Sequence, residues 1–149
     1  MKFEGCFVAI VTPFSADGSV DFDALQSHAS WMVDEGVSGV VVCGTTGESA
    51  TMSDDEKIGA INAVWDAVAD RATVVGGAGN NNTAASVRFV ERVNRDAKLH
   101  AIMSVVPYYN KPNQRGITQH FDAVIAASAN PVVLYNVPGR TVVSMMPRR

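Results

Sequence analysis

Five short apolar runs alternate along the chain with segments of helical periodicity. The runs are rich in Val, Ile and Ala and cover residues 6–11, 39–43, 73–75, 100–106 and 131–135. Continuous apolar runs of this length are typical of strands that are buried on both faces of a sheet. We therefore predict five buried strands.

Four helices are predicted between these strands, because apolar residues recur there every three or four positions. The first follows Asp21 and ends at Gly36, and the second opens with a capping-box pattern at residues 53–56. The third starts near Thr83 and the fourth near Gln114. The apolar stripes are Leu25, Ala29, Met32 and Val33; Ile58, Ile61, Trp65 and Val68; Ala85, Phe89, Val90 and Val93; and Ile117, Phe121, Val124 and Ile125.

Such an alternation requires parallel strands joined by right-handed crossovers, which leaves two α/β architectures. A length of 149 residues favours an open doubly wound sheet, since a (β/α)8 barrel typically needs about 250 residues. Polar loops argue for a barrel, in which all strand C-termini meet at one mouth. These loops follow every predicted strand, at Thr12 and at residues 44–49, 76–82, 108–111 and 136–141. The pattern by itself leaves both architectures open.

Composition and charge narrow the class of protein. With 47% hydrophobic and 18% charged residues, the chain should bury a core. The net charge is −3, and the longest basic cluster is Arg148-Arg149, so nothing supports nucleic-acid binding. The apolar run at residues 6–11 is too short for a membrane span and is not followed by a signal-peptide cleavage site. We expect a soluble, cytoplasmic protein with no membrane partner.

Cysteine and histidine positions indicate neither a disulfide nor a metal site. Cys6 and Cys43 both lie in apolar runs, which predicts buried free thiols. His28, His100 and His120 show no metal-ligand spacing, so we expect no metal, no cofactor and no histidine-activated nucleophile.

The turn at residues 44–49, Gly-Thr-Thr-Gly-Glu-Ser, is a candidate carboxylate site. Its glycines permit close backbone approach, and its N–H groups and threonine hydroxyls can bind an anion. It lacks the lysine of a phosphate-binding loop and the spacing of a dinucleotide-binding loop. A plain glycine turn that leads into a helix remains the alternative.

Three further side chains follow the fourth and fifth strands. Tyr108 and Tyr109 carry phenols that can relay a proton or fill an interface. Tyr135 ends the fifth strand, and the Pro-Gly turn after it can aim Arg140 at the mouth, where it can pair with a carboxylate. An exposed, solvated arginine is the alternative for Arg140.

Four ordered motifs together resemble the dihydrodipicolinate synthase family, also called the 4-hydroxy-tetrahydrodipicolinate synthase family. They are Val-Thr-Pro at residues 11–13, the turn at residues 44–49, Pro-Tyr-Tyr-Asn at residues 107–110, and Tyr-Asn-Val-Pro-Gly-Arg-Thr at residues 135–141. The resemblance extends from Phe3 to about Met146. Within the wider group of pyruvate-dependent aldolases and lyases, which includes N-acetylneuraminate lyase, the paired threonines and paired tyrosines favour the synthase.

The resemblance implies a (β/α)8 barrel, here truncated after the fifth strand to about half a barrel. Residues 1–149 would then form a single incomplete domain with strands one to five and helices one to four. The implied activity is a lyase reaction without a cofactor, in which pyruvate condenses with aspartate semialdehyde through a Schiff base in the diaminopimelate route to lysine. A homo-oligomer is implied as well.

The resemblance also implies roles for five residues. Tyr135 would donate and accept protons, with Thr45 and Tyr109 as the rest of its relay. Thr46 would bind the pyruvate carboxylate, and Arg140 would shape the entrance and receive the second substrate. The phenol of Tyr109 would reach across a subunit interface.

One departure separates this chain from the family pattern. The family's Schiff-base lysine lies on a sixth strand, beyond the end of this chain, and the lysines present are Lys2, Lys57, Lys98 and Lys111. None lies at an apolar strand end, where burial lowers the pKa of an amine. Two classes of function follow: the N-terminal half of an enzyme, inactive alone, or a non-catalytic remnant that binds small carboxylates or full-length subunits.

Overall fold

The computed structural model describes residues 3–147 and contains one sheet of five parallel strands. The strands are β1 (Phe7–Ala9), β2 (Gly39–Val42), β3 (Thr73–Gly77), β4 (Ala101–Val105) and β5 (Val132–Tyr135), and they lie side by side in sequence order. A doubly wound sheet would reverse its strand order at a switch point. The observed order is that of a barrel, so the prediction of a half-barrel is confirmed.

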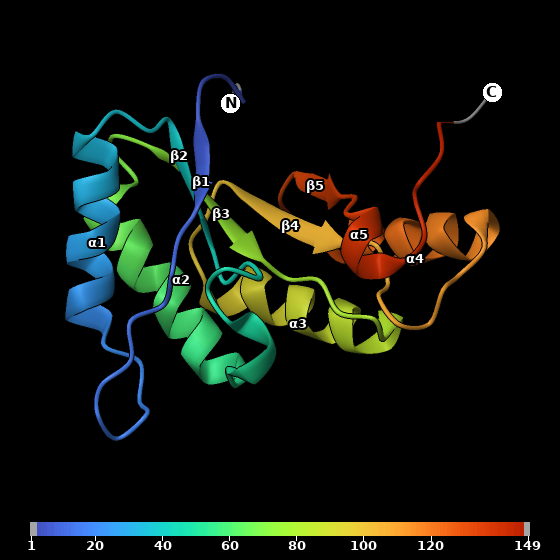
Figure 1. Cartoon of the computed structure of the whole chain (residues 1–149), viewed down its shortest axis with the longest axis horizontal. Coiled ribbons are helices and arrows are strands. Elements are labelled where there is room, and N and C mark those ends of the chain that lie inside the picture. Colours follow the sequence, from blue (N-terminus) through green and yellow to red (C-terminus); the bar gives the residue numbers. More distant parts are fainter. Residues whose placement is uncertain (1–2, 148–149) are drawn as a thin grey trace.

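Four long helices follow one another around the outside of this sheet (Figure 1). They are α1 (Phe22–Asp34), α2 (Asp54–Val68), α3 (Thr83–Asp96) and α4 (Gln114–Ala127), which confirms the predicted helices. Two short helices were not predicted, η1 (Ser49–Thr51) and α5 (Pro138–Thr141). The expected Pro-Gly turn is instead the start of α5, because a proline suits the first turn of a helix.

Side-chain caps explain why the long helices begin where the sequence predicts. The Asp21 carboxylate accepts a hydrogen bond from the Ala24 N–H at the start of α1. At the start of α2, Ser53 and Glu56 form the predicted capping box. Each cap satisfies N–H groups that have no partner within the helix.

The main core lies between the helices and the convex face of the sheet. Val40, Val74 and Ile102 are fully buried there, one from each central strand. Gly76 also faces this layer, where a Cβ would come 2.9 Å from side-chain atoms of Ile61 and Leu99. Close packing of β3 against α2 therefore depends on the missing side chain.

The two edge strands differ from the prediction. β1 and β5 are only partly buried, so the expectation that all five runs are buried on both faces is wrong for them. Each edge strand has one neighbour, which leaves one side of the strand uncovered. Cys6, which precedes β1, is exposed, so its predicted burial is wrong, whereas Cys43 is buried as predicted.

Among the helices of residues 3–147, none has the length and apolar character that a membrane span requires. Within the same residues, no three His, Cys, Asp or Glu side chains gather as a metal would need. The cytoplasmic location stays a prediction.

Candidate functional site

The turn at residues 44–49, called here the threonine turn, lies across the concave face of the sheet. A Cβ built on Gly44 would lie 3.7 Å from Met103 Cε of β4 and 3.9 Å from Ala9 Cβ of β1. Gly77, at the end of β3, makes the crossing possible, because a Cβ there would come 2.0 Å from the Cys43 carbonyl oxygen. A glycine at position 77 is therefore a requirement of this turn.

Tyr135 shares this concave face. It pairs in register with Val105, and paired residues of parallel strands point to the same side of a sheet. Val105 lies two residues after Met103 and so faces the same side, towards the threonine turn. The structure therefore places Tyr135 and the threonine turn on the same side of β4.

The threonine turn has a strained backbone at both ends. Cys43, which precedes it, has φ 55°, and Glu48 within it has φ 56°. Both values lie in the left-handed region that non-glycine residues rarely adopt. Hydrogen bonds from Gly47 N to Gly44 O and from Glu48 N to Thr45 O, each 3.1 Å, close the turn between these residues. Thr45 and Thr46 project from it and are exposed.

A pocket of about 530 Å³ opens beside the turn. Its lining includes Thr45 and Arg140, together with Tyr108, so the structure brings two of the five predicted site residues together. Tyr109 lies outside it but lines a neighbouring hollow with Arg140. Thr46 and Tyr135 line neither. The roles of all five residues stay predictions.

The pocket also contains a cation that sequence reasoning missed. Lys57 of α2 lines it with only 19% of its side chain exposed. Its Nζ lies 3.6 Å from Asp54 Oδ1 and 5.4 Å from the centroid of the Phe89 ring. The i, i+3 spacing of Asp54 and Lys57 was the available signal, but the sequence alone does not show that α2 and α5 border one pocket.

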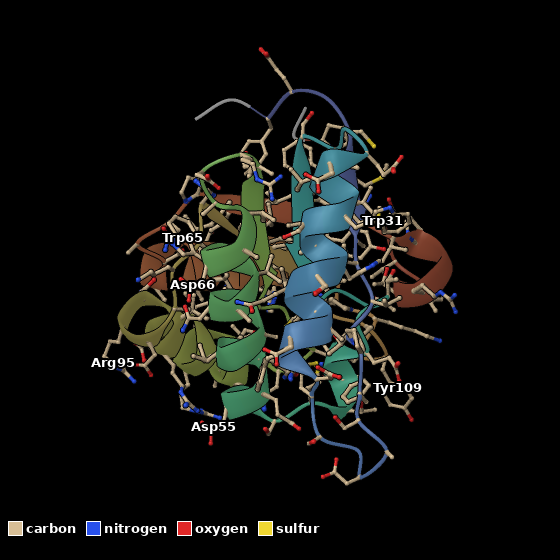
Figure 2. All side chains as sticks on the ribbon, turned by 90° about the vertical axis from the view of Figure 1, so that its left-hand side faces the viewer. Trp31, Asp55, Trp65, Asp66, Arg95 and Tyr109 are labelled. Atoms are coloured by element: carbon tan, nitrogen blue, oxygen red, sulfur yellow. The ribbon has the colours of Figure 1, made fainter. Side chains whose placement is uncertain are left out.

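Tyr109 points away from the molecule. In Figure 2 it lies toward the same end of the molecule as Asp55, which is in the first turn of α2. Its side chain is 87% exposed, and its φ of 69° lies in the left-handed region. The loop is tied to the one after β3 by a 2.7 Å hydrogen bond from Asn110 Nδ2 to Asn81 O. An aromatic side chain presented in this way is suited to contact a second molecule.

Arg140 is held at the pocket by the residue that follows it. Thr141 is fully buried, and its hydroxyl lies 2.7 Å from the Val143 carbonyl oxygen and 3.2 Å from the Val137 carbonyl oxygen. These contacts fix the single turn of α5 against the loop that follows it. The guanidinium of Arg140 remains exposed and can pair with a carboxylate.

Cys43 lies directly beside the threonine turn but is not a nucleophile. The residue is 2% exposed, and burial raises the pKa of its thiol to about 12, with Lys57 opposing the shift. A thiol rather than a thiolate is present near neutral pH. Its role is to pack beneath the turn.

Known proteins match this chain over nearly all of its length. The model of the dihydrodipicolinate synthetase family matches residues 2–149. The 4-hydroxy-tetrahydrodipicolinate synthase of Moorella thermoacetica is 46% identical over 144 residues, which are 95% of this chain and 48% of that protein.

Solved structures are likewise similar over nearly all of this chain and about half of their own length. Dihydrodipicolinate synthase from Bacillus anthracis superimposes with a TM-score of 0.91 at 40% identity, over 97% of this chain and 50% of the other. The enzyme from Acinetobacter baumannii, solved with pyruvate, gives a TM-score of 0.90 at 38% identity, over 97% of this chain and 49% of the other. The chain thus spans about half the length of its relatives. It belongs to the dihydrodipicolinate synthetase family.

Proposed function

We propose that this chain is the half of a 4-hydroxy-tetrahydrodipicolinate synthase that binds pyruvate and moves its protons, in the condensation with aspartate semialdehyde. The observation that carries the proposal is the placement of the threonine turn and Tyr135 on one concave face. Membership of the family and the pyruvate complex of the Acinetobacter baumannii relative support it.

The threonine turn binds the carboxylate of pyruvate in this proposal. The Thr46 hydroxyl and the backbone N–H groups of Thr45 and Thr46 donate hydrogen bonds to the carboxylate oxygens. The turn itself contains no lysine or arginine, so it adds no positive charge beside the amine that must attack the keto carbon. Thr46 is exposed, which is consistent with this role.

Proton transfer is assigned to three hydroxyl groups. Tyr135 gives and takes the protons of the reacting centre, and Thr45 connects its phenol to that of Tyr109. The outward direction of Tyr109 fits a phenol that enters the site of a second copy, so the working enzyme is a homo-oligomer in this proposal. Positioned proton donors of this kind typically contribute about 10²–10⁴-fold to rate.

Arg140 receives the second substrate. Its guanidinium is exposed and borders both the pocket and the neighbouring hollow. A planar guanidinium pairs with a carboxylate through two parallel hydrogen bonds, which suits the carboxylate of aspartate semialdehyde.

The amine nucleophile comes from outside this chain. A Schiff base forms when an unprotonated lysine attacks the keto carbon and water leaves. Lys57, the pocket lysine, forms an ion pair with Asp54, and Lys111 is exposed on a loop. We therefore assign residues 1–149 to one incomplete barrel domain, which acts only when the remaining strands supply the lysine.

Reductive trapping tests the proposal. The 149-residue chain is incubated with pyruvate and borohydride, and its intact mass is measured. We expect no adduct, whereas the same chain continued by the C-terminal half of the Moorella thermoacetica relative should gain one pyruvate per chain. A stoichiometric adduct on Lys57 or Lys111 of the short chain would contradict the assignment of the amine. Failure of the extended protein to form an adduct would instead favour a non-catalytic remnant.

A further inference from the structure

We propose that Thr12 is a positioning residue that holds the threonine turn in its binding conformation. Thr12 follows β1 and is only 5% exposed. Its Oγ1 donates a 2.7 Å hydrogen bond to the carbonyl oxygen of Gly47, which is 35 residues away in the sequence. The bond joins the end of the first strand to the middle of the turn.

The contact between these segments is close on both sides. A Cβ on Gly47 would come 3.0 Å from Thr12 Oγ1 and 3.1 Å from the Ile10 carbonyl oxygen, so the turn rests directly on the end of β1. Met52 Sδ lies 3.9 Å from the same hydroxyl, and Met52 is itself buried. A hydrogen bond shielded in this way is stronger than one exposed to water.

The turn needs such a restraint because its backbone is strained. Left-handed conformations at Cys43 and Glu48 persist only where the surroundings hold them. The Thr12 hydroxyl restrains the peptide that immediately precedes Glu48. Thr51 restrains the next one, through a 2.9 Å hydrogen bond from its Oγ1 to the Glu48 carbonyl oxygen.

The consequence rests on the proposed function of the threonine turn. Thr12 lies beneath the turn and acts on pyruvate only through Gly47. Without its hydroxyl, a smaller fraction of molecules holds the turn in the binding conformation. The apparent dissociation constant for pyruvate rises as that fraction falls.

The test uses the ¹⁵N-labelled 149-residue chain titrated with pyruvate, followed through the amide signals of residues 44–49. Thr12→Val keeps the shape of the side chain but removes its hydroxyl, and we expect about tenfold weaker binding from the loss of one buried hydrogen bond. Thr12→Ser keeps the hydroxyl and should restore binding to within about twofold. Thr118→Val is the matched control, since its hydroxyl bonds to the Gln114 carbonyl on α4, away from the turn.

The outcomes separate this inference from the function on which it rests. Equal pyruvate affinity in the wild type and Thr12→Val, with both folded by circular dichroism, would overturn the role of Thr12 alone. Absence of pyruvate-dependent shifts in the wild type would refute the proposed binding site and the inference with it. If Thr12→Val does not fold, Gly47→Ala perturbs the same contact with its added methyl group, and unchanged binding in that variant would overturn the inference.

Discussion

Backbone strain is concentrated where the chemistry is proposed. Within residues 3–147, five non-glycine residues have a positive φ: Cys43, Glu48, Tyr109, Lys111 and Val142. All five lie after β2, β4 or β5, at the carboxyl ends of the strands. Residues in sparsely populated conformations cost free energy and are kept where a fold holds a site in shape. The distribution supports a functional mouth at this end of the sheet.

At the residue scale, Tyr135→Phe tests the proton relay. The substitution keeps the ring and removes only the phenolic hydroxyl. In the extended protein of the trapping experiment, we expect turnover to fall about 100-fold or more, because a proton donor is lost. The KM for pyruvate should change less than about threefold, since the turn still binds the carboxylate. Steady-state kinetics measure both, and unchanged turnover would show that Tyr135 has no part in proton transfer.

A second prediction at this scale concerns His120. The residue is buried on α4, with its Nδ1 2.8 Å from Thr83 Oγ1 and its Nε2 without a hydrogen-bond partner within the described structure. Burial lowers the pKa of His120 below its ordinary value. Protonation of His120 therefore favours the unfolded chain. The stabilisation from the neutral imidazole is fully present above about pH 6.5, the ordinary histidine pKa. It is lost as the pH falls from there toward the lower pKa that His120 has in the folded state.

Urea unfolding at about pH 8 and about pH 5, on either side of the ordinary histidine pKa, measures this effect. The wild type should lose free energy of unfolding at the lower pH, and His120→Gln should lose less. Ser27→Ala, a substitution on α1 that removes no titratable group, is the control and should keep the wild-type pH dependence. Identical pH dependence in the wild type and His120→Gln would contradict the prediction.

At the scale of elements, local sequence signals decide where the helices begin. The capping box of α2 consists of a 2.7 Å bond from the Ser53 N–H to Glu56 Oε2 and a 3.3 Å bond from the Glu56 N–H to Ser53 Oγ. These groups belong to residues three apart, so the sequence predicts them without knowledge of the fold. The sequence did not predict α5, because a single helical turn is too short to show hydrophobic periodicity.

Ser53→Ala tests the contribution of this cap. Loss of the hydroxyl leaves the Glu56 N–H without its cap, and we expect the free energy of unfolding to fall by about 1 kcal/mol. Ser27→Ala on the exposed side of α1 removes a hydroxyl from a helix interior and should change stability by less than about 0.5 kcal/mol. Chemical denaturation of both variants is the measurement. Equal stability of the two would mean that the capping box does not stabilise α2.

At the scale of the whole molecule, the half-barrel has two open edges. β1 and β5 each pair with one neighbour, and Phe3, Val11 and Leu134 are exposed on or beside these strands. Unpaired strand edges and uncovered apolar surface favour association between molecules. We expect the 149-residue chain to self-associate or to be marginally stable. Light scattering after size-exclusion chromatography tests this, and a monodisperse monomer that melts above about 60 °C would contradict it.

The secondary-structure elements and the motifs can be predicted without knowledge of the fold. Apolar periodicity and caps are local, so five strands and four long helices follow from residues close together in the chain. The motif at residues 44–49 and the residues from Tyr135 to Arg140 were likewise enough to indicate the family. The hydrophobic pattern alone left an open sheet and a barrel as alternatives, because both architectures bury the same alternating pattern. The motifs favoured the barrel through the family that they resemble.

The contacts between distant residues follow only from the three-dimensional fold. It brought Lys57 of α2 and Arg140 of α5 to one pocket, and it set Thr12 against Gly47. It also exposed Cys6, although its neighbours in the sequence are apolar. These facts depend on strand order, on the crossing of the threonine turn over Gly77, and on which strands have a second neighbour. All three are set by packing between segments far apart in the chain, which a local pattern of hydrophobic and polar residues does not encode.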